Sequence, residues 1–226
     1  MYLFIVSALP VIILCLYIFL KDKNKEPKRL LIKLFVLGML SCIPAFFLEL
    51  FIIGTFDDYS NNFWYILCYS FLGVALIEEL CKYFITYFVT YKHKEFDEIY
   101  DMIVYSAFVS LGFAFLENIC YVYLYGYMTG LFRAILSVPF HACNGVFMGY
   151  YLGLAKSYAF YNNKSLERKN KIMSLAMAIL SHGFYDFCIF SGNLLAFIIF
   201  VIYVICMYLY CIKRINSVSK SGIKIK

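Results

Sequence analysis

The chain has 226 residues, of which 64% are hydrophobic and 15% are charged, and its mean hydropathy is +0.79. This composition is typical of a polytopic membrane protein and leaves little room for a soluble domain. The net charge of +6 does not indicate nucleic-acid binding, because the basic residues are confined to short connecting segments. The nine cysteines stand singly in apolar sequence, which indicates free thiols rather than a disulfide or zinc framework.

Seven apolar runs follow one another along the chain. If the N-terminus lies outside, every Lys and Arg except Lys82 and Arg133 falls in or beside a cytoplasmic segment. The sequence therefore predicts an all-α polytopic membrane protein of about seven transmembrane helices, N-terminus outside and C-terminus cytoplasmic. One domain is expected over residues 1–226. The predicted spans are 1–20, 31–54, 64–91, 99–125, 132–155, 172–190 and 194–212.

The fifth span carries two packing signals. Gly145, Gly149 and Gly153 form a ridge of small residues that lets a neighbouring helix approach closely. Pro139 is expected to kink the helix and to free the backbone carbonyl of Ile135.

Four spans carry Glu, His, Asp or Lys inside otherwise apolar sequence, all within about residues 70–190. An ionised side chain in hydrocarbon costs at least about 2.5 kcal/mol, so such residues normally face a protein interior. Four separate clusters of acid–base residues predict an active site. Its candidate catalytic residues are Glu78, Glu79, Glu117, His141, His182 and Asp186, and its candidate supporting residues are Lys82, Asn118 and Asn144.

The third span places Glu78 and Glu79 one helical turn from Lys82, so the ammonium can meet either carboxylate. Neutralising one Lys requires only one acid. Two adjacent carboxylates beside one ammonium titrate at different pH values, so one can act as general base while the other stays structural.

The two membrane histidines each have a polar partner at helical spacing. His182 and Asp186 are four residues apart, so Asp186 can accept a hydrogen bond that fixes the imidazole tautomer. His141 and Asn144 are three residues apart on the fifth span.

Two further sites hold acids whose function is less specific. Glu117 and Asn118 lie toward the outer half of the fourth span, where interhelical hydrogen bonding explains them as well as chemistry does. Glu49, near the outer end of the second span, is interpreted as an interfacial acid.

With these motifs in order, the chain resembles the PrsW intramembrane proteases of Gram-positive bacteria, distant relatives of the CAAX prenyl endopeptidase superfamily. The resemblance rests on Glu78-Glu79-x-x-Lys82, Gly112-Phe113-Ala114-x-x-x-Glu117-Asn118, His141 and His182-x-x-x-Asp186. It implies a multi-pass protease of the bacterial cytoplasmic membrane. The implied reaction is the first (site-1) cut in a single-span anti-sigma factor during cell-envelope stress signalling. The expected partners are this substrate and membrane lipid, without nucleic acid.

The resemblance also implies roles for individual residues. Carried over from the CAAX relatives, Glu78 is the leading general base, and His182 with Asp186 forms the oxyanion or orienting pair. This chain has Lys82 in place of an Arg one position later, and Glu117 in place of a His. It also has Asp186 in place of an Asn, and the roles of Glu117 and His141 stay open.

The favoured mechanism is water activated by a carboxylate, with no cofactor. A Zn²⁺ ion held by Glu78, Glu117, His141 and His182 is the alternative, because two Glu and two His suit zinc. Lys82 beside the paired acids disfavours a nearby cation. Rival functions are a non-catalytic membrane scaffold and a proton-coupled transporter.

Overall fold

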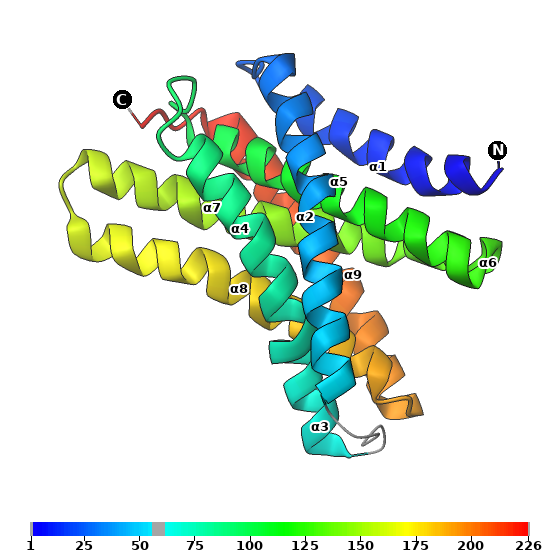
Figure 1. The fold of residues 1–226 in the computed structure, drawn as a ribbon. Coiled ribbons are helices and arrows are strands. Elements are labelled where there is room, and N and C mark those ends of the chain that lie inside the picture. The colour runs from blue at the N-terminus through cyan, green and yellow to red at the C-terminus, as the bar shows by residue number, and fades with distance from the viewer. Residues whose placement is uncertain (1, 56–61, 226) are drawn as a thin grey trace.

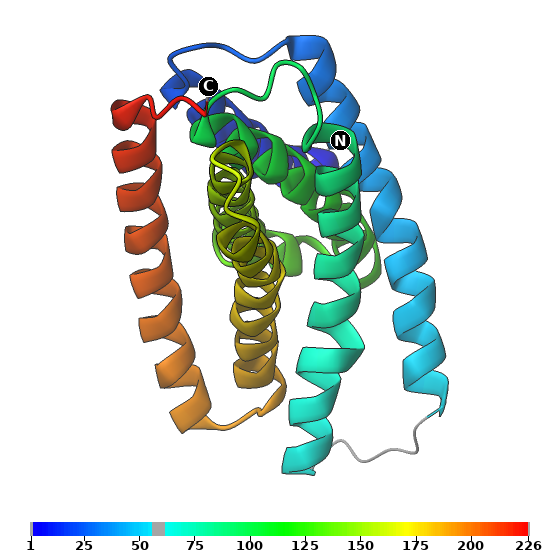
Figure 2. The same ribbon diagram turned by 90° about the vertical axis from the view of Figure 1, so that its left-hand side faces the viewer.

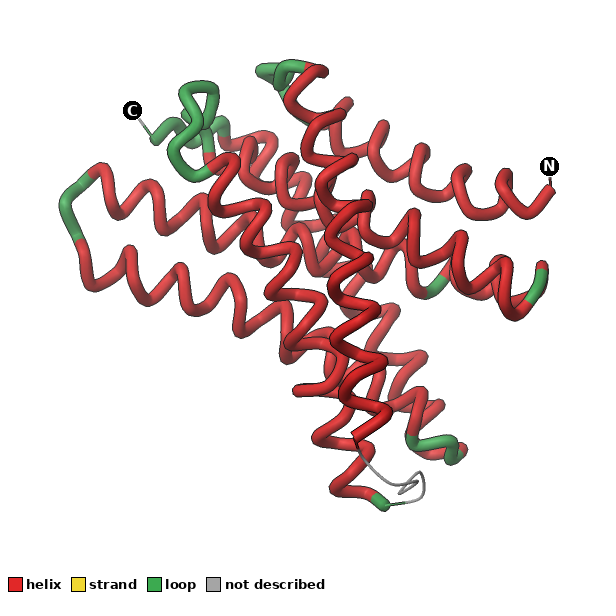
Figure 3. The backbone as a smooth tube through the Cα atoms, viewed as in Figure 1, coloured by secondary structure: helices red, strands yellow, loops and turns green. Residues whose placement is uncertain are grey.

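The computed structural model describes residues 2–55 and 62–225, which form helices joined by short loops (Figure 1, Figure 3). Seven helical segments of this part are long and apolar enough to cross a membrane, which confirms the all-α polytopic class. The domain bounds 1–226 and the orientation of the termini stay predictions, and residues 1, 56–61 and 226 lie outside the described residues. The helices are α1 (Tyr2–Lys21), α2 (Lys28–Thr55), α3 (Phe63–Cys68), the π-helix η1 (Tyr69–Ala75), α4 (Leu76–Thr90), α5 (Ile99–Tyr125), α6 (Tyr127–Ile135), α7 (Ser137–Phe160), α8 (Lys164–Phe190) and α9 (Leu194–Ser221).

Three predicted helix ends are wrong because the helices continue past their apolar runs. Residues 156–171 were expected to be a loop, but α7 and α8 leave only 161–163 between them. The lysines in these helix ends have partners. Lys156 Nζ donates to the carbonyl of Tyr91, and Lys171 forms an ion pair with Glu167 one turn earlier. Likewise, α9 runs to Ser221 rather than to residue 212. Hydropathy marks the part of a helix that suits hydrocarbon, not the residue where the helix ends.

Three of the segments predicted to be cytoplasmic meet at one end of the molecule. Asn24 Nδ2 donates to Glu98 Oε1, and Lys23 Nζ lies 2.9 Å from the carbonyl of Lys220. The backbone N–H of Ile225 donates to the carbonyl of Asp97 at 2.7 Å. The described N-terminal end of α1 lies at the other end of the molecule (Figure 1). This arrangement agrees with the predicted alternation of the spans.

Helix α5 forms the centre of the bundle. It is the most buried span and packs extensively against α7, α2 and α1. Helices α7 and α8 in turn lie between α9 and the continuous α3–η1–α4 helix (Figure 2). The residues of α4, α5, α7 and α8 that carry acid–base groups therefore share one interior.

The predicted glycine ridge is confirmed at the contact between α7 and α5. A Cβ atom on Gly145 would lie 2.8 Å from Ala107 Cα, and one on Gly149 would lie 2.6 Å from Ile103 Cα. Backbone atoms cannot yield as the end of a flexible side chain can. Only glycine allows α7 to approach α5 this closely.

We expect Gly149→Ala to lower the free energy of unfolding by about 1–3 kcal/mol, because the added methyl group pushes α7 away from α5. Thermal unfolding of the detergent-purified protein measures this. Ser165→Ala, at an exposed position near the start of α8, is the control. Equal melting temperatures for Gly149→Ala and the control would contradict the packing described here.

The predicted effect of Pro139 is also confirmed. The helix is interrupted at Leu136, between α6 and α7, and Tyr208 Oη of α9 lies 3.0 Å from the carbonyl oxygen of Ile135 and 2.6 Å from that of Leu136. The Tyr208 hydroxyl thus donates to the Ile135 carbonyl, which Pro139 leaves without its helical partner, and also contacts the Leu136 carbonyl, which accepts from the N–H of Phe140. The break separates α6 from α7, and α6 carries Arg133, a residue of the site described next.

Candidate active site

The ammonium group of Lys82 is the centre of the buried polar network. Lys82 is fully buried, and its Nζ lies 2.9 Å from Glu78 Oε2, 2.9 Å from Glu79 Oε1 and 3.1 Å from His141 Nδ1. An ammonium group has three protons, so these three acceptors use all of them. Both pairings expected from the helical spacing occur together.

A stretch of π-helix immediately precedes the paired glutamates. Residues Tyr69–Ala75 form η1, and α4 begins at Leu76, so Glu78 and Glu79 stand in the first turn after the wider helix. Single-turn π-helical segments inside α-helices are frequent at functional sites. Nothing in the sequence pattern indicated this change of helical pitch.

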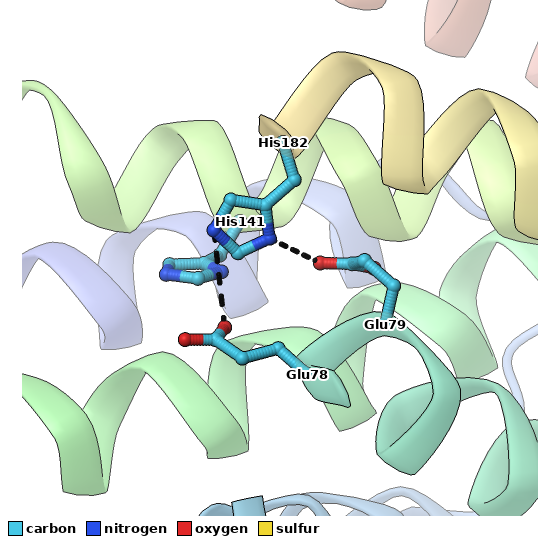
Figure 4. Close-up of side chains that lie close together, drawn as sticks. All are labelled: Glu78, Glu79, His141 and His182. Atoms are coloured by element: carbon cyan, nitrogen blue, oxygen red, sulfur yellow. Dashed lines mark hydrogen bonds and ion pairs between the residues drawn. The ribbon is translucent and has the colours of Figure 1, made fainter. Parts of the chain in front are cut away.

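The two adjacent carboxylates have different surroundings. Glu79 has no exposed surface, and its Oε1 accepts hydrogen bonds from Lys82 Nζ and from His182 Nδ1, the latter at 2.8 Å (Figure 4). Glu78 lines a cavity, and only its Oε2 is engaged by Lys82. Its Oε1 has no hydrogen bond to any side chain in the described part of the chain. Glu79 is therefore placed as a structural acid, and Glu78 as the acid that can meet water.

The imidazole of His182 bridges the glutamates and Asp186. Because Glu79 Oε1 is an acceptor, we assign the Nδ1 proton of His182 to that hydrogen bond. The other ring nitrogen, Nε2, lies 3.5 Å from Asp186 Oδ2 and 3.9 Å from Glu78 Oε2. The expectation that Asp186 fixes the tautomer is wrong here, because Glu79 makes the shorter contact. Nε2 is left facing the cavity side of the site.

His141 connects two halves of the network. Lys82 can only donate, so His141 Nδ1 accepts and the ring carries its proton on Nε2. That Nε2 lies 3.0 Å from Glu117 Oε2. Both ring nitrogens are thus occupied, and His141 holds Lys82 and Glu117 in place rather than offering a free base.

Arg133 belongs to this network and was not among the predicted site residues. Its Nη2 lies 2.8 Å from Glu117 Oε2, and its Nε donates to Asn118 Oδ1 at 3.1 Å. Its guanidinium carbon lies 3.9 Å from the ring centroid of Tyr121. The signal in the sequence was that Arg133 is the basic residue left on the predicted outer side.

Asn144 is the predicted site residue that the structure leaves apart. It is fully buried one turn beyond His141, and neither side-chain polar atom has a hydrogen-bond partner among the described residues. It does not line the cavity. Asn118 does not line the cavity either, but its side chain accepts a hydrogen bond from Arg133, which does.

The cavity has a volume of about 530 Å³ and opens among α2, η1, α4, α5, α6, α7 and α8. Most of its lining is apolar or aromatic, which suits a hydrophobic peptide segment. Glu49, which the sequence predicted to be an interfacial acid near the outer end of the second span, lines the cavity too. The charged and imidazole groups of the lining are Glu49, Glu78, Glu117, Arg133, His141, His182 and Asp186.

The same network tests whether the site fits a zinc ion. Ligand atoms of Glu78, Glu79, His141 and His182 all lie within 4.8 Å of one another, so the donor set and spacing are of the right kind. This set contains Glu79 where the set of zinc ligands predicted from the sequence contained Glu117. However, Lys82 Nζ is hydrogen-bonded to three of these four residues, so its positive charge would repel a cation bound among them. The arrangement described here therefore does not fit zinc unless the ammonium is displaced.

We expect Arg133→Met to slow turnover about tenfold with little change in folding, because Glu117 loses its cation while His141 keeps its contact with Lys82. Arg133→Lys should recover part of the rate. Steady-state cleavage of a membrane-embedded substrate measures both variants. Unchanged turnover in Arg133→Met would remove Arg133 from the machinery of the site.

In the part of the chain that the structure describes, seven helices long and apolar enough to cross a membrane enclose a carboxylate–ammonium–imidazole network beside a largely apolar cavity, which is the arrangement expected of a polytopic membrane enzyme. The family described as "PrsW family intramembrane metalloprotease" matches residues 26–212. The chain belongs to this family and is a multi-pass bacterial membrane peptidase.

Similar proteins named Protease PrsW support this assignment. The chain is 39% identical over 210 residues to that of Oceanobacillus iheyensis, covering 92% of this chain and 93% of the relative. It is 38% identical over 179 residues to that of Bacillus subtilis, covering 79% and 78%. It is 33% identical over 213 residues to that of Clostridioides difficile, covering 91% and 87%. No solved structure matches the chain.

Proposed function

We propose that this peptidase makes the first (site-1) cut in a single-span anti-sigma factor during cell-envelope stress signalling, using water activated by a carboxylate. The observation that carries the proposal is the placement of Glu78. It faces an apolar cavity with one oxygen free while Lys82 holds the other. An extended single-span substrate is the kind of ligand that a cavity among membrane helices can admit.

In this mechanism, Glu78 takes a proton from a water molecule as the water oxygen attacks the carbonyl carbon of the scissile bond. The same proton then passes to the leaving nitrogen as the carbon–nitrogen bond breaks. In its doubly protonated form, with Nδ1 donating to Glu79 and Nε2 facing Asp186, His182 stabilises the developing oxyanion by donating a hydrogen bond from Nε2. Lys82 keeps Glu78 in position and balances its charge.

A zinc-dependent mechanism is the second candidate. It is favoured by the four ligand-type side chains within 4.8 Å and by the description of the family as metalloproteases. It would require the Lys82 ammonium to leave its three acceptors. We therefore favour the cofactor-free mechanism.

The test uses the purified protein in lipid nanodiscs with a panel of single-span anti-sigma factors, and mass spectrometry locates any cut. We expect one cut near the predicted outer face in at least one substrate, and the Glu78→Gln variant should not make it. A well-folded preparation that cleaves no member of the panel would contradict the proposed substrate class. Proton-linked flux in liposomes would then favour the transporter hypothesis, and its absence the scaffold hypothesis.

A further inference from the structure

One face of α2 forms a wall of the cavity. The lining residues on this helix are Cys42, Ile43, Phe46, Glu49 and Leu50, whose spacing is that of a single helical face. Glu49 is the charged member of this face. Within residues 2–55 and 62–225 it takes part in no hydrogen bond or ion pair.

The charges that surround the cavity leave this carboxylate without a cation. Arg133 is already engaged by Glu117 and Asn118. Lys82 already donates hydrogen bonds to three other acceptors. An unpaired ionised carboxylate in a largely apolar, membrane-embedded cavity is costly, so this group is neutralised by a proton when the cavity is empty, and a basic ligand side chain would stabilise its ionised form.

The position of Glu49 sets its distance from the reacting groups. Cys42 shares a small buried cluster with Phe113, whose ring centroid lies 4.1 Å from Lys82 Nζ, and lines the cavity with Glu78, so we take Cys42 as the level of the buried network. Glu49 follows seven residues later, which is about 10 Å along the helix axis. An extended peptide advances about 3.3 Å per residue, so this distance corresponds to about three residues.

We propose that Glu49 is a specificity-determining residue that binds a basic side chain of the substrate, located about three residues from the scissile bond toward the C-terminal end of α2. The inference rests on the proposed peptidase function and adds a substrate class to it. An ammonium or guanidinium group forms a charge-assisted hydrogen bond with a carboxylate. Such a contact would also fix the register of the peptide relative to Glu78.

The experiment takes one single-span substrate that the wild-type protein cleaves and maps its cut. Substrate variants are then made in which Lys, Gln or Glu replaces one residue at a time, at each of the four positions on either side of the cut. Cleavage rates are measured for wild type, Glu49→Gln, Glu49→Lys and the control Glu95→Gln, which makes the same chemical change outside the cavity. Gel filtration and thermal unfolding confirm that each variant is folded.

We expect wild type and Glu95→Gln to cleave the substrate with Lys at one position about tenfold faster than the one with Gln. Glu49→Gln should lose this preference, and Glu49→Lys should prefer Glu at the same position. A Lys preference that survives in Glu49→Gln, or no preference in wild type, would overturn the inference while leaving the peptidase intact. Failure of the folded wild type to cleave any substrate would overturn the proposed function, and this inference with it.

Discussion

Glu78→Gln is expected to reduce cleavage by about 10²–10⁴-fold while leaving the protein folded, because the amide cannot take a proton from water. The amide oxygen can still accept the hydrogen bond from Lys82, so the buried network keeps its shape. Single-turnover cleavage of a reconstituted substrate, followed by mass spectrometry, measures the loss.

Glu79→Gln is the matched comparison, since it makes the same change one residue along the helix. Glu79 is fully buried and holds both Lys82 and His182, so this variant should lose stability as well as activity. If Glu78→Gln cleaved at the wild-type rate, or if the two variants lost the same amount of stability, the different roles given to the two acids would be wrong.

Lys82→Met is expected to have the largest effect on folding, with a loss of about 3–5 kcal/mol in the free energy of unfolding. The substitution leaves two buried carboxylates and the Nδ1 atom of His141 without their common donor. Thermal unfolding in detergent measures the loss. Adding Glu79→Gln to Lys82→Met should restore part of the stability, because one uncompensated charge disappears.

The same variant separates the two mechanisms. With the ammonium gone, the four ligand-type side chains are free to bind a divalent cation, so Lys82→Met should gain affinity for zinc relative to wild type. Isothermal titration with zinc measures this. A wild-type protein that binds zinc as tightly as Lys82→Met would show that the Lys82 ammonium does not hinder zinc binding.

The sequence predicted the helical class, the ridge of glycines and the interruption near Pro139 because these depend on local composition. Apolar length identifies a span, a small residue every fourth position identifies a close contact, and proline lacks the N–H that a helix needs. Ionisable residues inside apolar runs indicated which side chains face inward. The helical fold and the gathering of the acid–base residues in one interior could therefore be predicted from the sequence.

Other features depend on contacts between helices that spacing within one helix does not encode. Asp186 is at the correct spacing to orient His182, but Glu79 from another helix lies closer. Arg133 sits on α6, whose direction is set by the break at Leu136 and by Tyr208 of α9. The place of Glu49 in the cavity lining could not be predicted, because its position along α2 says nothing about which neighbouring helices it faces. Tertiary placement decided each of these cases.

The measurement that tests the central claim most directly is the cleavage rate of wild-type protein whose bound metal has been removed and quantified by mass spectrometry. We expect the full rate at a metal content well below one ion per chain, and loss of the cut in Glu78→Gln treated in the same way. A rate that falls in proportion to the metal removed, and returns on adding one equivalent of zinc, would contradict the carboxylate-activated mechanism.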